Sequence, residues 1–298
     1  MGTEILPNVS WWPWGGRHTL PKVTTAMCRL LAYVAPAPST FTDVIGTDQG
    51  SAFQRLARLH ADGWGTMWVD PAGKVRRERT AGGGSRDTDL TNALNGRRAH
   101  ASVAHLRLAT GGLSVREENT HPFVTDGVGF AHNGSILPVG DLRAMLAKAT
   151  LRRCQGNTDS EMYFGLVRER LADGLDLGDA VAAAVTTIRE RFPVAGLNAM
   201  VLDSDHLVTV RASTHASVPS DHFAERGIID ADLPPAHDEA YYDLRIRVQD
   251  GAIAVASSGL DTTGWEDLPL DSVTVVDLAT VTARTRLLET AHVSAEGR

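Results

Sequence analysis

The sequence predicts a single layered α+β domain, because strand-like and helix-like segments occur in separate blocks along the chain. Strand-like runs predominate up to residue 134 and again from residue 197, whereas helical spacing of apolar residues predominates between them. The chain has 298 residues, 43% of them hydrophobic, which is enough to bury a substantial core. We find no internal repeat and no Gly/Ser-rich linker in the sequence.

The first block combines strands with two short helices. The run CRLLAYVA at 28–35 is largely apolar, as in a buried strand. Residues 71–73 are typical of a hairpin turn, and Gly96 follows a helix-like run that an Asp precedes. Strands are therefore expected at 28–35, 63–70, 74–80, 102–110 and 128–134, and helices at 51–61 and 87–96.

The later blocks are helical and then again strand-like. One apolar stripe consists of Leu177, Ala180, Val181, Ala184, Val185 and Ile188. Helices are expected near 139–148 and at 159–172 and 176–192, and strands at 197–212, 241–248, 252–259 and 272–278, with a loop at 213–240.

Composition argues against several functions. The net charge of −7 and the pI of about 5.9 do not suit a nucleic-acid binder, which usually carries a basic surface. No run of about 18 apolar residues predicts a transmembrane helix, so no membrane partner is expected. Two cysteines, Cys28 and Cys154, form no disulfide framework and indicate a reducing compartment, hence a cytoplasmic protein.

Residues 1–27 lack the basic start and the apolar run of a secretory signal. They contain WWPWGG at 11–16, where proline and glycine disfavour a helix. We interpret 1–27 as a disordered leader that is removed, or as an upstream start that is not translated. A membrane-interface anchor is the alternative.

Three later segments carry polar groups suited to binding an amino acid. In the strand HLRLAT, Arg107 lies on the face opposite Leu106 and can bind a carboxylate through two hydrogen bonds, or form a structural ion pair. Asn133 and Gly134 in AHNGSI offer two donors to one oxyanion, or form a tight turn. Asp159 in NTDSE can bind an ammonium group, or cap the helix that follows, as can Thr158.

Cysteine and histidine give weaker signals when each is considered alone. Cys28 can be a core cysteine, and Cys154 has no evident partner. The histidines at 100, 105, 121 and 132 occur on separate segments without HxxxH spacing, so no metal site is expected.

Together, the motifs MCRLLAY, DGWG, HLRLAT, ENTHPF, AHNGSI and TDSE resemble the class II glutamine amidotransferases, most of all their stand-alone YafJ-like group. These are N-terminal-nucleophile (Ntn) hydrolases with a cysteine nucleophile. The resemblance implies a four-layer αββα sandwich over residues 28–285, followed by a tail at 286–298. It implies an enzyme that needs no cofactor and no metal.

The resemblance also implies residue roles. Cys28 corresponds to the nucleophile, and Asn133 and Gly134 to the oxyanion hole. Arg107 corresponds to the residue that holds the substrate α-carboxylate, and Asp159 to the one that binds its α-ammonium. His121 and Thr110 are placed with the substrate-binding residues.

The chemistry requires a free α-amine on Cys28, because an amide nitrogen is not a base. Initiation at Met27 followed by methionine removal is the simpler route, and self-cleavage of a pro-segment is the other. The function expected is hydrolysis of glutamine or of a γ-glutamyl compound. The alternatives are a glutaminase subunit that delivers ammonia to a separate synthase, and a non-catalytic binding protein. The sequence makes no prediction of oligomeric state.

Overall fold

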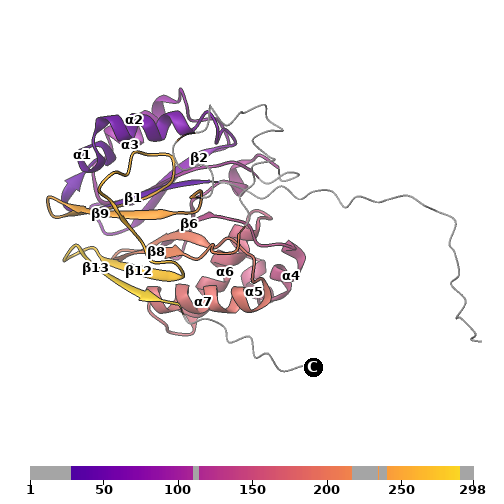
Figure 1. The fold of residues 1–298 in the computed structure, drawn as a ribbon. Helices are drawn as coiled ribbons and strands as arrows, with labels where there is room; N and C mark the ends of the chain where they lie inside the picture. The colour runs from indigo at the N-terminus through magenta and orange to yellow at the C-terminus, as the bar shows by residue number, and fades with distance from the viewer. Residues whose placement is uncertain (1–27, 110–113, 217–233, 235–239, 289–298) are drawn as a thin grey trace, which may run out of the picture.

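Two antiparallel sheets pack face to face, and helices cover both outer sides, in the computed structural model of the chain (Figure 1). The structure describes residues 28–109, 114–216, 234 and 240–288. The first sheet has the strand order β11-β9-β10-β1-β4-β2-β3, and the second has the order β13-β12-β8-β7-β6-β5. The expected αββα sandwich is therefore confirmed.

The strands are β1 (Arg29–Ser39), β2 (Trp64–Val69), β3 (Val75–Thr80), β4 (Ala99–Leu106), β5 (Phe123–Thr125), β6 (Val128–Asn133), β7 (Asn198–Leu202), β8 (His206–Arg211), β9 (Leu244–Gln249), β10 (Ala252–Ser257), β11 (Glu266–Asp267), β12 (Ser272–Asp277) and β13 (Thr282–Leu287). The helices are α1 (Phe41–Ile45), α2 (Thr47–Leu56), α3 (Thr88–Asn95), α4 (Val139–Ala144), α5 (Lys148–Leu151), α6 (Asp159–Ala172) and α7 (Leu177–Arg191), and a 3-10 turn covers Glu117–Asn119.

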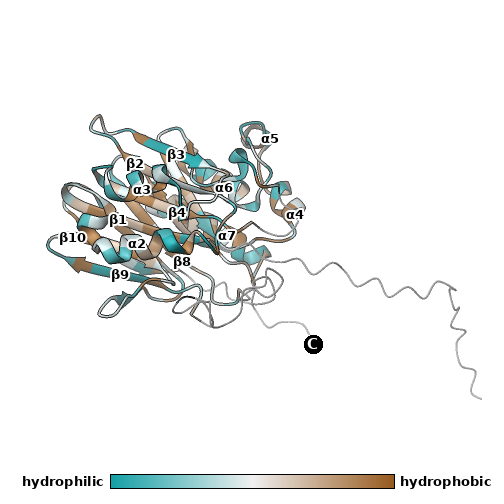
Figure 2. Ribbon diagram, turned by 90° about the horizontal axis from the view of Figure 1, so that it is seen from above, coloured by the Kyte–Doolittle hydropathy of each residue, from teal (hydrophilic) through white to brown (hydrophobic). Residues whose placement is uncertain are grey.

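Strand alternation divides the apolar side chains among three core layers. Leu31 and Tyr33 of β1 face the helices α1, α2 and α3, whereas Leu30 and Ala32 face the second sheet. A third layer, which includes Val181 of α7, lies between the second sheet and the helices α4 to α7. Figure 2 shows hydrophilic residues on the outer helix α2 and hydrophobic ones on the strands beneath it. Both faces of β1 are therefore buried, as its largely apolar sequence predicts.

Two predicted helices differ from the observed ones. The helix expected at 51–61 begins at Thr47 and ends at Leu56, because the amides of Ala57 and Arg58 donate to carbonyls three residues back in a tighter turn. The helix expected near 139–148 is two helices, α4 and α5. Ala147 separates the two helices because its backbone is extended, and its N–H donates to Glu169 Oε1 over 2.9 Å.

Several expectations concern parts of the chain outside the described residues. These are the leader 1–27 with its WWPWGG segment, Thr110, most of the expected loop 213–240 and the last ten residues.

The strand register places the chemically important segments at one end of the sandwich. Arg29 of β1 pairs with Leu106 of β4, so Cys28 and Arg107 lie at the same end of these two antiparallel strands. In the second sheet Asn133 ends β6, opposite Asn198 of β7. The first residue of α6, Asp159, contacts the same region through Ile136.

Candidate active site

Cys28 lies immediately before β1 and is 3% exposed. Its backbone N–H donates to Asn133 Oδ1 over 2.9 Å, a contact that crosses from the first sheet to the second. Burial raises the pKa of the thiol to about 11, although a hydrogen bond from the Leu108 backbone and the positive charge of Arg107 act in the opposite direction. At pH 7 only about one thiol in 10,000 is then ionised, so nucleophilic attack needs a base.

Asn133 presents a donor with no partner. Its Nδ2 is buried and makes no hydrogen bond to any described residue, while its Oδ1 accepts from Cys28. A buried donor without a partner costs roughly 1–3 kcal/mol, and a negatively charged oxygen would satisfy it. Gly134 follows, and a Cβ there would lie 2.1 Å from the Gly196 carbonyl oxygen, so the backbone approach admits no side chain.

Arg107 is buried just beyond the end of β4, where the DGWG segment holds it. Its Nη1 donates to the Asp62 carbonyl over 3.2 Å, and Asp62 Oδ2 accepts from the Ala109 N–H over 2.8 Å. Within the described part of the chain, Arg107 forms no ion pair with a carboxylate. Burial lowers its pKa, yet the guanidinium stays charged at neutral pH. Its charge is thus available to an anionic ligand.

Asp159 is the first residue of α6, and Thr158 is the N-cap. The Thr158 side chain accepts from the Glu161 N–H over 3.2 Å, so the Asp159 carboxylate does not cap the helix. Asp159 Oδ2 instead accepts from the Ile136 N–H over 2.7 Å and thereby fixes the turn after Gly134. The helix dipole also favours a negative charge at this position.

A pair that the sequence analysis did not assign supports this arrangement. His132 Nε2 donates to the Gly196 carbonyl over 2.8 Å, so the Ser160 hydroxyl donates to His132 Nδ1 over 2.9 Å. Burial lowers the pKa of His132, which favours the neutral ring. The pair connects the end of β6 to the start of α6. The histidine of AHNG and the serine of TDSE were present in the motifs, but their spacing gave no indication that they pair.

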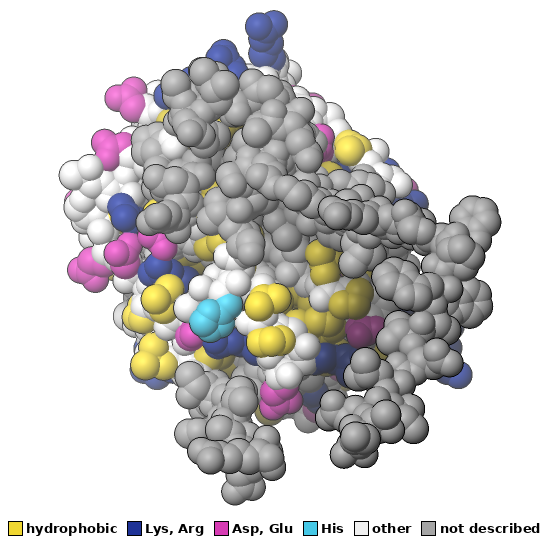
Figure 3. Space-filling view, turned by 45° about the vertical axis from the view of Figure 1, so that its right-hand side comes forward, with side chains coloured by type: hydrophobic (Ala, Val, Ile, Leu, Met, Phe, Trp, Pro, Cys, Tyr) yellow, Lys and Arg dark blue, Asp and Glu magenta, His cyan; other side chains and the backbone are white. Residues whose placement is uncertain are grey.

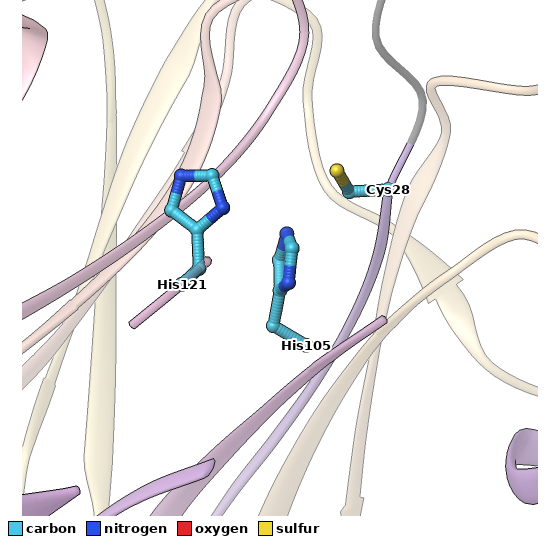
Figure 4. Close-up of side chains that lie close together, drawn as sticks. All are labelled: Cys28, His105 and His121. Carbon is cyan, nitrogen blue, oxygen red and sulfur yellow. The ribbon is translucent and has the colours of Figure 1, made fainter. Parts of the chain in front are cut away.

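Two further histidines lie beside the thiol. The ring centroids of His105, on β4, and His121 are 4.3 Å apart. One ring nitrogen of His105, one ring nitrogen of His121 and Cys28 Sγ all lie within 4.8 Å of one another. Figure 4 shows the three side chains converging from three segments. Burial lowers the pKa of His105 to about 3 and that of His121 well below its usual value. The predicted substrate-binding residue His121 is thus next to the predicted nucleophile.

A small cavity of about 20 Å³ lies at the centre of these groups. Its lining includes five of the seven predicted site residues: Cys28, Arg107, His121, Gly134 and Asp159. Asn133 is joined to Cys28 by a hydrogen bond, and Thr110 lies outside the described residues. The cavity holds roughly one water molecule, so a glutamyl group requires its walls to move apart.

In the part of the face that Figure 3 colours, basic, acidic and apolar side chains are interspersed. Among the described residues, no helix is long and apolar enough to cross a membrane.

Comparisons with curated proteins give two kinds of relative. The γ-glutamyl-hercynylcysteine sulfoxide hydrolase of Mycobacterium tuberculosis is 24% identical over 255 residues, which is 82% of this chain and 90% of that protein. The glutamine–fructose-6-phosphate aminotransferase of Bradyrhizobium diazoefficiens is 37% identical over 98 residues. That alignment covers 33% of this chain, and the chain spans only 16% of the aminotransferase.

Solved structures share the fold. A glutamine aminotransferase class-II domain protein from Silicibacter pomeroyi has a TM-score of 0.59 at 19% identity, and 88% of this chain matches 100% of that chain. The glutamine phosphoribosylpyrophosphate amidotransferase of Bacillus subtilis has a TM-score of 0.54 at 14% identity, and 89% of this chain matches 50% of that chain.

A family model matches most of the chain. The model of the class-II glutamine amidotransferases matches residues 27–287, which include every predicted site residue. The two-sheet, four-layer arrangement is the Ntn-hydrolase fold of the matched structures. The chain therefore belongs to the class-II glutamine amidotransferase family.

Proposed function

We propose that the chain is a stand-alone amidohydrolase that cleaves the γ-amide of glutamine or of a γ-glutamyl compound through a thioester on Cys28. The observation that carries the proposal is the contact between Cys28 and Asn133. The backbone nitrogen of Cys28 meets Asn133 Oδ1, and the other end of the same amide is an unpaired buried donor. One side chain would thus orient the base and stabilise the oxyanion.

The charges around the cavity suit the amino-acid end of a glutamyl group. Arg107 would bind the α-carboxylate, and Asp159 would bind the α-ammonium through the oxygen that does not accept from Ile136. Both groups line the same cavity as Cys28. They would place the γ-carbonyl, at the opposite end of the substrate, next to the sulfur.

Acylation would use the free α-amine of Cys28. Such an amine has a pKa of roughly 7.7, so roughly a fifth of it is neutral at pH 7 and can accept the thiol proton. The thiolate attacks the γ-carbonyl carbon, and Asn133 Nδ2 and the Gly134 backbone would stabilise the oxyanion. The tetrahedral intermediate expels ammonia or an amine, which leaves with the proton from the α-ammonium.

Deacylation reverses these roles. The α-amine takes a proton from water, and the resulting hydroxide attacks the thioester carbon. The C–S bond breaks, glutamate leaves, and the thiol regains its proton.

The mechanism requires Cys28 to become the first residue. While Met27 is attached, the Cys28 nitrogen is an amide without a basic lone pair, and the raised pKa of the thiol leaves it protonated. We favour initiation at Met27 and removal of that methionine, with self-cleavage of residues 1–27 as the other route. The catalytic domain would then correspond to the proposed 28–285 segment.

The test compares three chains: one from Met1, one from Cys28, and the second with Cys28→Ala. Each is treated with a glutamine-mimicking diazoketone and analysed by intact mass and peptide mapping, and glutaminase activity is measured in parallel. We expect labelling at Cys28 and activity in the Cys28-initiated chain alone. Activity that survives Cys28→Ala, or a Cys28-initiated chain that is neither labelled nor active, would refute the thioester mechanism.

A glutaminase subunit that supplies ammonia to a synthase is the second candidate. The similarity to a glutamine–fructose-6-phosphate aminotransferase, of which this chain spans a small part, favours it. Addition of the partner synthase with its acceptor should then raise the rate of glutamine hydrolysis. A rate that no partner changes supports the stand-alone hydrolase. A protein that retains 1–27 in its cells and functions with Cys28→Ala would instead be a binding protein.

A further inference from the structure

Cys28, His105 and His121 form a cluster whose chemistry the proposed hydrolysis does not require. Their ligand atoms all lie within 4.8 Å of one another, and all three side chains are buried. The spacing along the sequence gave no indication of this cluster, since the three residues come from the position before β1, from β4 and from the loop before β5.

Three of the four ring nitrogens of His105 and His121 have no hydrogen-bond partner among the described residues. His105 Nε2 donates to the His132 carbonyl over 3.3 Å, which leaves Nδ1 as a lone-pair acceptor with no partner among the described residues. A carbonyl that fixes the tautomer in this way is typical of histidines that bind metals. Both ring nitrogens of His121 are also buried and unpartnered in the described part of the chain.

Gly65 allows the two rings to approach. It pairs with His105 across β2 and β4, and a Cβ on it would lie 2.3 Å from the His121 carbonyl oxygen and 2.7 Å from Pro122. Any side chain at this position would push the His121 segment away from β4. Gly65, the second glycine of the DGWG motif, therefore shapes this cluster.

We propose that Cys28 Sγ and the imidazoles of His105 and His121 bind a thiophilic divalent cation such as Zn²⁺. Zinc accepts one thiolate and two neutral imidazoles in tetrahedral geometry, with metal–ligand bonds of about 2.0–2.3 Å. The ligand atoms would then be about 3.3–3.6 Å apart, so they need to draw together by roughly 1 Å. Binding replaces the thiol proton by the metal, and a fourth position stays open to water.

The bound metal would switch off the nucleophile. A thiolate whose lone pair is held by zinc does not attack a carbonyl carbon, so an enzyme of the proposed type would be reversibly inhibited. The metal site itself needs neither a free α-amine nor a glutamyl ligand. It is therefore independent of the proposed hydrolysis.

The test uses Co²⁺ as a spectroscopic probe on the full chain and on the Cys28-initiated chain, after dialysis against a chelator. We expect one Co²⁺ per chain, a sulfur-to-cobalt charge-transfer band, and displacement of cobalt by Zn²⁺. Cys28→Ala should remove the band, and His105→Gln or His121→Gln should weaken binding by at least about tenfold.

Matched controls distinguish this site from adventitious binding. His100→Ala removes another histidine of β4, and Cys154→Ala removes the other thiol; neither should change the affinity. Circular dichroism verifies that each variant is folded. The absence of a sulfur-to-cobalt band in folded protein, or its loss in Cys154→Ala, would overturn the metal site. Cobalt binding with normal affinity in a chain that hydrolyses no glutamine would support the site while the proposed hydrolysis fails.

Discussion

At the residue scale, Arg107 and Asp159 are two opposite charges that line one cavity, yet no ion pair joins them. Arg107 donates to a backbone carbonyl, and Asp159 accepts from a backbone N–H. Two opposite charges that are buried close together normally form an ion pair with each other. Since these two do not, a zwitterionic ligand between them would gain from both.

Replacement of Arg107 by Ala should therefore lower kcat/KM for glutamine by about 10- to 100-fold, because the substrate carboxylate would lose a charge-assisted hydrogen bond. Steady-state kinetics of the Cys28-initiated enzyme measure the change. The control is 4-aminobutyramide, which lacks the α-carboxylate. If Arg107→Ala slows this substrate to the same degree, Arg107 does not bind the carboxylate.

The buried histidines predict an acid-sensitive fold. His105 has a pKa of about 3 in the folded chain, and an unfolded histidine titrates near 6.5, so between these values the unfolded chain binds more protons. The free energy of unfolding should fall as the pH is lowered from about 6.5 towards 3, by up to about 1.4 kcal/mol per pH unit for this residue. Urea unfolding of metal-free protein at several pH values measures the slope. His105→Gln should reduce it, and an unchanged slope would contradict the assignment.

The sequence motifs indicated single residues of the site better than their mutual contacts. Cys28, Arg107, Gly134 and Asp159 meet at one cavity because each lies at the end of a strand or helix that the motifs mark. The His132–Ser160 pair was not predicted. It depends on how the end of β6 packs against the start of α6, which hydrophobic periodicity does not determine.

At the element scale, Thr158 is the N-cap of α6 and leaves the Asp159 carboxylate free to accept from the Ile136 N–H. Thr158→Ala should cost about 1 kcal/mol of stability and also raise KM, because Asp159 becomes free to move towards the uncapped amides. The matched control is Asp176→Ala, which removes the exposed N-cap of α7. It should lower stability to a similar degree with KM unchanged. Chemical denaturation and kinetics check both variants, and equal KM values would mean that the cap does not position Asp159.

The turn after β6 offers a second comparison. Gly134→Ala would bring a Cβ against the Gly196 backbone and displace Asn133, so both stability and activity should fall. Gly140→Ala, inside α4 with open space around it, should leave activity unchanged and be neutral or stabilising by up to about 1 kcal/mol. Thermal unfolding and glutaminase assays compare the two. A fully active Gly134→Ala enzyme would show that this close approach does not shape the site.

Helix α6 and the hairpin of β2 and β3 could be predicted from periodicity and turn residues, because their signals are local. The short strand β5 and the edge strand β13 could not. Their pairing depends on the neighbouring strands, and all six residues of β13 are exposed.

At the scale of the whole molecule, β1 lies in the middle of its sheet, between β10 and β4. Its amides should exchange with solvent only through global unfolding, whereas those of the edge strand β13 should exchange faster through local opening. Native-state hydrogen exchange measures the difference. Protection in β13 equal to that in β1 would contradict it.

The layer order of the sandwich came from the resemblance to a family and not from periodicity. Blocks of strands and helices predicted an α+β domain, but they did not specify which strands share a sheet. The neighbours β1 and β10 are separated by more than 200 residues, for example Leu31 and Ala256. Such pairings arise from the packing of the whole chain, and patterns in a single sequence give no direct information about it.

The central position of β1 also sets an order of events during protein synthesis. The strand that follows Cys28 is made first, yet its partner β10 leaves the ribosome after nearly all of the chain. Until then β1 lacks one of its two neighbours, and under the proposed processing a peptidase would reach the bond before Cys28 more readily. Once β10 pairs, that bond adjoins a buried residue. The proposed removal of the residues before Cys28 would thus compete in time with completion of the first sheet, and slow translation would favour the processed chain.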